Sequence, residues 1–227
     1  MAFDKVYCIC MDDQPKKTKN LFSQLNHHFP EWNPEVFNAI NTRHLKNHYI
    51  GCTLSHRAVI QEAKDRKYKN ILVFEEDALL RKNFRELFLQ NIKELAYTPW
   101  DILYLGSCVW EPKPPKKPRT FESAPNCDYL KFLTRSTCTH GLAYNSSCYN
   151  YILNSWPDNI DDMQKWCKKH KALDQWLMYK MQGIGSVKDG YRKFRCLTTT
   201  PRLCSQPFLV GDNKQDDPKM FYDKRAI

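Results

Sequence analysis

Short apolar runs alternate along the chain with segments whose apolar residues recur three and four positions apart. The first pattern is typical of buried strands, and the second of helices that pack one face against a sheet. The expected strands are residues 5–11, 36–40, 70–74, 101–105, 141–144 and 194–199. The expected helices are residues 15–28, 51–66, 83–97, 146–155 and 172–181. Strands and helices alternate in the first half, which predicts an α/β fold with a central, mostly parallel sheet flanked by helices.

The strand at residues 70–74 is apolar almost throughout, and it runs directly into Glu75, Glu76 and Asp77. Ligands of open α/β sheets bind beyond the carboxyl ends of the strands, so these acids lie where a site is expected. Strand alternation points Glu75 and Asp77 the same way. Two neighbouring carboxylates repel, and a divalent cation such as Mg²⁺ or Mn²⁺ offsets that cost. The alternative is a solvated acidic loop before a helix N-terminus.

Asp174 is an acid among the apolar residues Leu173, Trp176 and Leu177, which form the buried stripe of a short helix. An acid at the edge of such a stripe can have a raised pKa and act as a general base. The alternative is that it caps the N-terminus of that helix.

Ser55 and His56 are adjacent in the helix expected at residues 51–66. Neighbours on a helix point about 100° apart, so the two cannot form a nucleophile and base pair with each other. We interpret Ser55 as a packing or capping group, and His56 as a polar group that faces either the cleft or solvent.

The 227 residues, 42% hydrophobic, are expected to form one domain, residues 1–227, with its own core. Residues 110–125 interrupt the pattern with five prolines and several basic residues, and we interpret them as an irregular loop over the acceptor. No apolar run approaches the roughly 20 residues of a membrane-spanning helix. No secretory leader precedes the first strand, which favours a cytoplasmic protein.

The net charge of +10 favours an anionic partner such as a nucleotide diphosphate, an acidic membrane surface or a nucleic acid. The basic residues are scattered and no nucleic-acid-binding motif accompanies them, so no nucleic-acid partner is expected, although the acidic triplet could also serve a metal-dependent nuclease. The ten cysteines show no C-x-x-C pair and no zinc-ligand spacing, and we expect free thiols.

Several segments, in this order, resemble glycosyltransferase family 25, which includes bacterial lipooligosaccharide galactosyltransferases and collagen galactosyltransferase domains. The sequence VYCICMD at residues 6–12 is similar to the family's I-N-L-D start, with Cys10 in place of Asn. GCTLSH at residues 51–56 resembles its G-C-x-x-S-H helix, and ILVFEED at residues 71–77 resembles its strand ending in E-D-D. The later landmarks are GLAY at 141–144, LDQWL at 173–177, Pro201 and Gln206.

This resemblance implies a GT-A fold, a UDP-sugar donor (UDP-galactose or UDP-glucose) and inversion at the anomeric carbon. Residues of about 1–109 would form the nucleotide-sugar-binding half, and residues of about 126–227 the acceptor and catalytic half. Asp174 would be the general base that deprotonates a hydroxyl on a glycan, a glycolipid or a collagen-like hydroxylysine. The ligands of Mn²⁺ or Mg²⁺ would be Asp77, Glu75 and Asp212. The residues that would contact the donor are Cys10, Asp12, Ser55, His56, Glu76 and Gln206. The alternative is a non-catalytic module that binds nucleotide-sugar or glycan.

Overall fold

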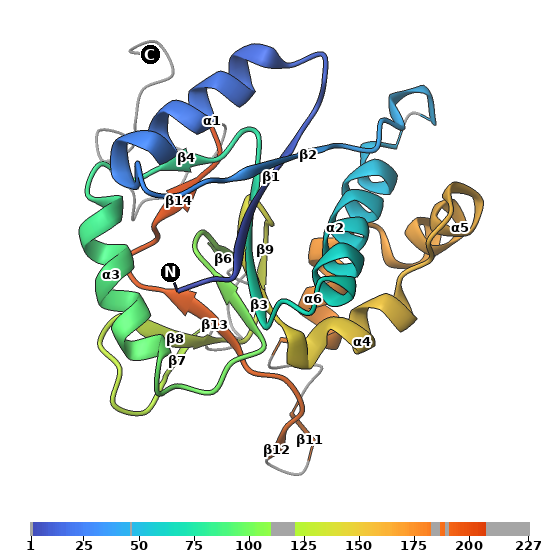
Figure 1. Ribbon diagram of the computed structural model, residues 1–227. Helices are drawn as coiled ribbons and strands as arrows, with labels where there is room; N and C mark the ends of the chain where they lie inside the picture. The colour runs from blue at the N-terminus through green and yellow to red at the C-terminus, as the bar shows by residue number, and fades with distance from the viewer. Residues whose placement is uncertain (1, 46, 110–120, 183–186, 189–190, 208–227) are drawn as a thin grey trace.

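The computed structural model describes residues 2–45, 47–109, 121–182, 187–188 and 191–207. An eight-stranded sheet forms the centre of this part of the chain, and helices cover both of its faces (Figure 1). The expected α/β class is confirmed. Most of the expected acceptor loop, residues 110–120, lies outside the described residues, and so does the predicted metal ligand Asp212.

The sheet combines both strand directions. Its strands, in order across the sheet, are β2 (Glu35–Asn38), β1 (Lys5–Cys10), β3 (Asn70–Glu75), β10 (Gly141–Asn145), β5 (Ile102–Tyr104), β13 (Cys196–Thr199), β8 (Leu130–Leu133) and β7 (Phe121–Ser123). Strands β10 and β8 run antiparallel to both of their neighbours, and the remaining pairs are parallel. The other six strands therefore all point the same way, so the sheet is mostly parallel as expected.

Helices and short strand pairs make up the remaining regular structure of the described residues. The helices are α1 (Pro15–His28), α2 (His48–Asp65), α3 (Phe84–Leu95), α4 (Ser146–Ser155), α5 (Ile160–His170) and α6 (Leu173–Lys180), with a 3₁₀ turn, η1, at Arg43–Leu45. The two-stranded pairs are β4 (Leu79–Leu80) with β14 (Cys204–Ser205), β6 (Cys108–Val109) with β9 (Ser136–Thr137), and β11 (Val187–Lys188) with β12 (Tyr191–Arg192).

Strand β3 is apolar on both sides because helices cover both faces of the sheet. Leu72 and Phe74 belong to the core between the sheet and helices α1 and α3. Ile71 and Val73 belong to the core between the sheet and helices α2, α4, α5 and α6, on the opposite side in Figure 1. Alternation therefore places Glu75, the last residue of β3, on the same side as α2.

The expected helices all form, and the differences have local causes. Helix α2 begins at His48, three residues before the predicted start, because the side chain of Asn47 caps it by accepting a hydrogen bond from the Tyr49 amide. Helix α5 was not predicted, since its sequence is mostly polar and it buries only Met163 and Cys167. Strands β7 and β8, at the far edge of the sheet, were also not predicted.

The expectation that all thiols are free is wrong at Cys138, which is disulfide-bonded. Eight other described cysteines are free, and six of these eight are buried. Separately, none of the described helices has the length and apolarity that crossing a membrane requires.

Candidate active site

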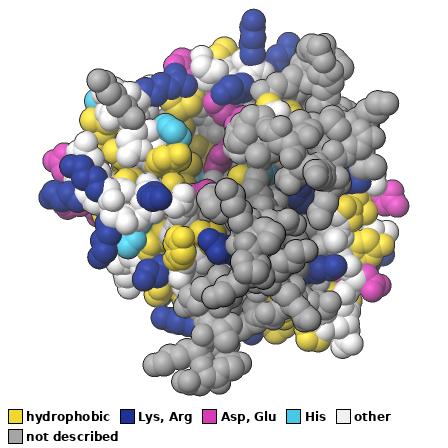
Figure 2. Space-filling view, turned by 180° about the vertical axis from the view of Figure 1, so that it is seen from behind, with side chains coloured by type: hydrophobic (Ala, Val, Ile, Leu, Met, Phe, Trp, Pro, Cys, Tyr) yellow, Lys and Arg dark blue, Asp and Glu magenta, His cyan; other side chains and the backbone are white. Residues whose placement is uncertain are grey.

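A cavity of about 520 Å³ opens beyond the carboxyl ends of β1 and β3, a size usual for small-molecule sites. Its walls come from the ends of these strands, the first turns of α2 and α6, and the segments at residues 39–43 and 138–139. Figure 2 shows acidic side chains inside a hollow on this molecule, with hydrophobic side chains beside it. Glu75, Glu76, Asp77 and Asp174 all line the cavity, so the structure brings the predicted acids together.

Glu76 links the end of β3 to the end of β1 by hydrogen bonds. Its carboxylate accepts a hydrogen bond from the Met11 amide at 2.8 Å and pairs with the Lys17 ammonium at 3.2 Å. Its own amide donates to the Ile9 carbonyl at 3.1 Å. These contacts hold strand β1, helix α1 and strand β3 in one arrangement, and they occupy both carboxylate oxygens of Glu76.

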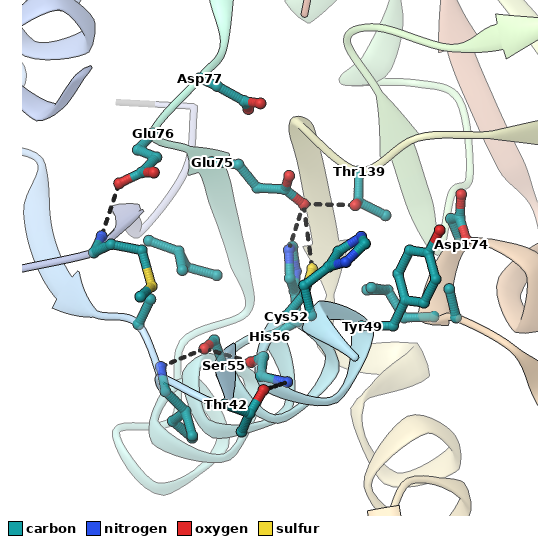
Figure 3. A pocket seen from close by; sticks show the side chains of 18 of the residues that line it. Thr42, Tyr49, Cys52, Ser55, His56, Glu75, Glu76, Asp77, Thr139 and Asp174 are labelled. Carbon is teal, nitrogen blue, oxygen red and sulfur yellow. Dashed lines mark hydrogen bonds and ion pairs between the residues drawn. The ribbon is translucent and has the colours of Figure 1, made fainter. Parts of the chain in front are cut away.

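Glu75 is held by side chains of α2 and of the 138–139 segment (Figure 3). Its Oε1 accepts from the Thr139 hydroxyl at 2.5 Å and lies 3.2 Å from Nε2 of His56 and 3.8 Å from Sγ of Cys52. Burial alone would raise the pKa of Glu75, but the contacts with His56 and Thr139 hold it below its ordinary value. Glu75 is therefore an ionised carboxylate with one oxygen fully engaged.

Cys52, His56 and Glu75 could also hold a metal ion, because their donor atoms lie within 4.8 Å of one another. Such a set of sulfur, nitrogen and oxygen ligands suits zinc better than Mg²⁺ or Mn²⁺. Burial raises the pKa of the Cys52 thiol well above its ordinary value, which disfavours the thiolate that zinc needs. The hydrogen bonds of His56 and Thr139 account for this cluster without an ion.

Asp77 lies in the turn that follows β3, where the Ala78 amide donates to the Glu75 carbonyl. Strand alternation therefore stops at Glu75, and Figure 3 shows the Asp77 side chain apart from the contacts of Glu75. The Gln206 amide donates to both carboxylate oxygens of Asp77, at 3.2 and 3.3 Å. Burial and then the charge of Glu75 raise the pKa of Asp77 to about 6. A nearby cation would relieve this unfavourable concentration of negative charge.

Asp174 lies in the first turn of α6, but it is not the helix cap, because Ala172 occupies that position. Its Oδ1 accepts from the Gln175 amide at 2.7 Å, and its Oδ2 accepts from the Cys138 amide at 3.3 Å. Burial raises the pKa of Asp174, the direction that makes a carboxylate a stronger base. Cys138 and its neighbour Thr139 therefore hold Asp174 and Glu75, one carboxylate each.

Gly51 and Ser55 of the G-C-x-x-S-H segment hold the segment at residues 40–42, which forms part of the cavity wall. The buried Ser55 hydroxyl donates to the Gly51 carbonyl at 2.7 Å and accepts from the Ile40 amide at 2.8 Å. The Gly51 amide donates to the Thr42 hydroxyl at 2.9 Å. A Cβ at Gly51 would lie 2.2 Å from the Ile40 carbonyl oxygen, so the approach of the 40–42 segment to α2 requires glycine here.

Of the other residues predicted to contact the donor, some line the cavity and some do not. Gln206, Ser55 and His56 line the cavity, although Ser55 and His56 are fully buried and bonded to protein groups. Cys10 is buried in the core beside α1, and Asp12 is exposed; neither lines the cavity. The residues lining the cavity that the sequence analysis did not single out include Thr42, Arg43, His48, Tyr49 and Thr139.

A family model and curated relatives indicate one family. The family model described as glycosyltransferase family 25 (LPS biosynthesis protein) matches residues 13–127, half of the chain. Procollagen galactosyltransferase 2 from Mus musculus is 29% identical over 190 residues, covering 79% of this chain and 28% of that protein. Its Homo sapiens counterpart is 30% identical over 184 residues, covering 78% of this chain and 27% of that protein. The chain thus spans little more than a quarter of the length of these relatives.

Relatives described as inactive also match. The probable inactive glycosyltransferase 25 family member 3 from Bos taurus is 25% identical over 137 residues, covering 47% of this chain and 22% of that protein.

A solved structure, described as a glycosyltransferase involved in the glycosylation of the major capsid of PBCV-1, aligns with 11% identity and a TM-score of 0.38, covering 74% of this chain and 76% of that one. On the family match, the chain belongs to glycosyltransferase family 25.

Proposed function

We propose that the chain transfers galactose or glucose from a UDP-sugar to a hydroxyl acceptor, with inversion at the anomeric carbon and with Mn²⁺ or Mg²⁺ bound. One observation carries the proposal: two carboxylates with raised pKa values, Asp77 and Asp174, open on one cavity of a glycosyltransferase-family chain. Carboxylates with perturbed pKa values in a cleft are typical of functional sites.

The cavity offers complementary surfaces for a nucleotide diphosphate. Lys17 and Arg43 line it and supply positive charge for phosphate, although Arg43 also pairs with Asp13. Ile9 and Ala39 line it with apolar surface that suits a nucleobase. The donor would lie across the ends of β1 and β3, where ligands bind in open α/β sheets.

The residues around Asp77 fit a divalent cation. Asp77 contributes a carboxylate whose described partner is the Gln206 side chain, and Gln206 carries an amide oxygen that can also be a ligand. Among the described residues, the side-chain contacts of Glu75 all use Oε1, and Figure 3 shows its other oxygen on the side of Asp77. Such hard oxygen donors suit Mg²⁺ or Mn²⁺. A bound ion would act as a Lewis acid that stabilises charge on the departing diphosphate.

Asp174 is suited to accept the proton of the acceptor hydroxyl. The amides of Cys138 and Gln175 fix its carboxylate, and burial strengthens it as a base. Deprotonation would let the acceptor oxygen attack the sugar from the face opposite the leaving group, which gives inversion. General-base assistance of this kind contributes about 10²–10⁴-fold to rate.

A donor screen tests the proposal. UDP release would be measured with UDP-galactose and UDP-glucose, together with simple hydroxyl acceptors, in the presence of Mn²⁺, Mg²⁺ or a chelator. We expect release with one of these donors that the chelator abolishes, and loss of release in Asp77→Asn and Asp174→Asn. Asp161→Asn, at an exposed acid in the first turn of α5, is the matched control and should keep full activity. Release that a chelator leaves unchanged would overturn the metal assignment.

The second candidate is a module that binds nucleotide-sugar without turnover, which the relatives described as inactive bring into consideration. It predicts that UDP-sugar raises the melting temperature in Mn²⁺ while no UDP is released from any donor. The presence of both Asp77 and Asp174 in the cavity favours the enzyme.

A further inference from the structure

Tyr49 is an exposed aromatic residue in the wall of the candidate active site. The residue is 43% exposed, whereas Tyr7, Tyr104 and Tyr144 are fully buried in the core. It lines the cavity, and its ring lies beside that of His48, with 4.1 Å between the ring centroids. An exposed aromatic ring in a cavity wall offers a flat apolar surface to a ligand.

The backbone of Tyr49 is rigidly placed. Its amide donates to the side chain of the helix cap Asn47 at 3.1 Å, and its carbonyl accepts from the Thr53 hydroxyl at 2.7 Å. It occupies the first turn of α2, an 18-residue helix that packs on the sheet. The chain therefore presents this ring to the cavity from a fixed support, as a preorganised binding surface requires.

Tyr49 and Asp174 both line the cavity, from the first turns of α2 and α6. In the view of Figure 3 their side chains lie on one side of Glu75, with Asp77 and Glu76 on the other. Under the proposed function, Asp174 deprotonates the acceptor, and Asp77 belongs to the donor diphosphate. A group that rests on Tyr49 would therefore be the acceptor.

We propose that Tyr49 is the stacking platform of the acceptor subsite and that the acceptor is a pyranose ring of a glycan. This inference rests on the proposed function, which assigns Asp174 as the base. A pyranose presents C–H groups on its faces and hydroxyl groups around its edge. Stacking one face on the Tyr49 ring would direct an edge hydroxyl toward Asp174, so the same residue would bind the sugar and orient its nucleophile.

The shape of this surface, and not the charge of the cavity, favours a sugar. Four carboxylates line the cavity against the cationic side chains of Lys17 and Arg43, so its charge would also accept an ammonium group. A flat, exposed aromatic ring matches the C–H face of a pyranose, whereas the flexible side chain of hydroxylysine offers no such face.

The test compares acceptors on Tyr49 variants. Methyl β-galactopyranoside, methyl β-glucopyranoside and N-acetyl-hydroxylysine methylamide would be the probes. We expect Tyr49→Ala to raise the KM of an accepted methyl glycoside about 10-fold, the size of one lost aromatic contact. Tyr49→Trp and Tyr49→Phe, which keep a ring, should stay near wild type. Tyr179→Ala is the matched control, because Tyr179 is 54% exposed on α6 and does not line the cavity.

Two further readouts separate this inference from the proposed function. Hydrolysis of UDP-sugar by water reports the donor site alone, and its KM should not change in Tyr49→Ala. Saturation-transfer NMR of the methyl glycosides, with UDP and diamagnetic Mg²⁺ present, reports acceptor binding without turnover, and the signal should fall in Tyr49→Ala. Complete absence of UDP release would refute the transferase, whereas this NMR signal would still report on Tyr49.

Four outcomes would overturn the inference. They are an unchanged glycoside KM in Tyr49→Ala, a raised donor KM in that variant, no glycoside signal with the wild-type protein, and acceptance of the hydroxylysine probe with none of the glycosides.

Discussion

The hydroxyl of Tyr144 lies 3.0 Å from Nδ1 of His56, and both side chains are fully buried. Burial raises the pKa of Tyr144, so its hydroxyl keeps its proton. Nε2 of His56 faces the Glu75 carboxylate at 3.2 Å and donates to it, because an ionised carboxylate only accepts, so Nδ1 can accept from the Tyr144 hydroxyl. A tyrosine on β10 thus supports the histidine by which α2 holds the carboxylate at the end of β3.

Removing the Tyr144 hydroxyl should lower the stability of the protein and also weaken its response to ligand. Tyr144→Phe leaves Nδ1 of His56 without its donor, which should lower the free energy of unfolding by about 1–2 kcal/mol. It should also let His56 turn away from Glu75, and weaken the thermal stabilisation by Mn²⁺ with UDP-sugar. Urea unfolding and melting curves measure the two effects.

Tyr149→Phe is the matched control, because Tyr149 is also buried and its hydroxyl donates to the Tyr144 carbonyl, 3.4 Å away. We expect a comparable loss of stability and an unchanged ligand response. Equal loss of ligand response in both variants would show that the effect is one of general packing.

Asp77→Asn should stabilise the protein in the absence of metal. The pKa of Asp77 is about 6 in the folded state against an ordinary 3.8. Because the folded-state value is the higher one, ionisation costs stability as pH rises between the two values. Above pH 6 the cost is up to about 3 kcal/mol, and it disappears below the ordinary value.

Urea unfolding in chelator checks this expectation. Asp77→Asn should be the more stable protein at pH 8, with the difference vanishing toward pH 4. In Mn²⁺ with UDP-sugar the order should reverse, since only wild type gains from the ion. A variant that is less stable than wild type at pH 8 in chelator would contradict the electrostatic account of Asp77.

Asp174→Asn should abolish most transfer while sparing donor binding. The amide keeps an acceptor for the Gln175 N–H but cannot take a proton, so transfer should fall about 10²–10⁴-fold. Because burial raises the pKa of Asp174, wild-type transfer should decline on acidification at a pH above the ordinary aspartate value. The pH profile of kcat/KM for acceptor measures this decline. An acid limb that persists unchanged in Asp174→Asn would assign the base to another residue.

The sequence predicted best the elements whose signals are local. Strand β3 was recognisable because helices cover both of its faces and make it apolar throughout. Helix α5 was missed because its sequence is mostly polar and buries only Met163 and Cys167, so few apolar residues mark its buried face. The disulfide at Cys138 was missed because spacing alone does not reveal a pair that tertiary structure brings together.

For the site, the sequence placed the acids but not their partners. Alternation put Glu75 on the α2 side of the sheet, yet its hydrogen bond from Thr139 depends on a residue 64 positions later in the chain. Asp77 lines the same cavity as Glu75, but from a turn and not by strand alternation, because the strand ends two residues earlier. Nothing in the sequence indicated that Tyr49 faces the cavity, because its position depends on Asn47 starting the helix.

The contacts of Gly51 and Ser55 on α2 with the segment at residues 40–42 should be needed for stability and donor binding. Gly51→Ala would place a methyl group 2.2 Å from the Ile40 carbonyl oxygen and 2.8 Å from the Thr42 hydroxyl, which should cost about 1–3 kcal/mol or more. Ser55→Ala removes the acceptor of the Ile40 amide and should cost about 1–3 kcal/mol and raise the donor KM. Ser155→Ala, which removes a helix hydroxyl bonded only to the preceding turn, is the control. If melting curves and donor KM showed Ser55→Ala to be as mild as Ser155→Ala, the segment at 40–42 would be held in place by other contacts, and the cavity wall would not depend on this motif.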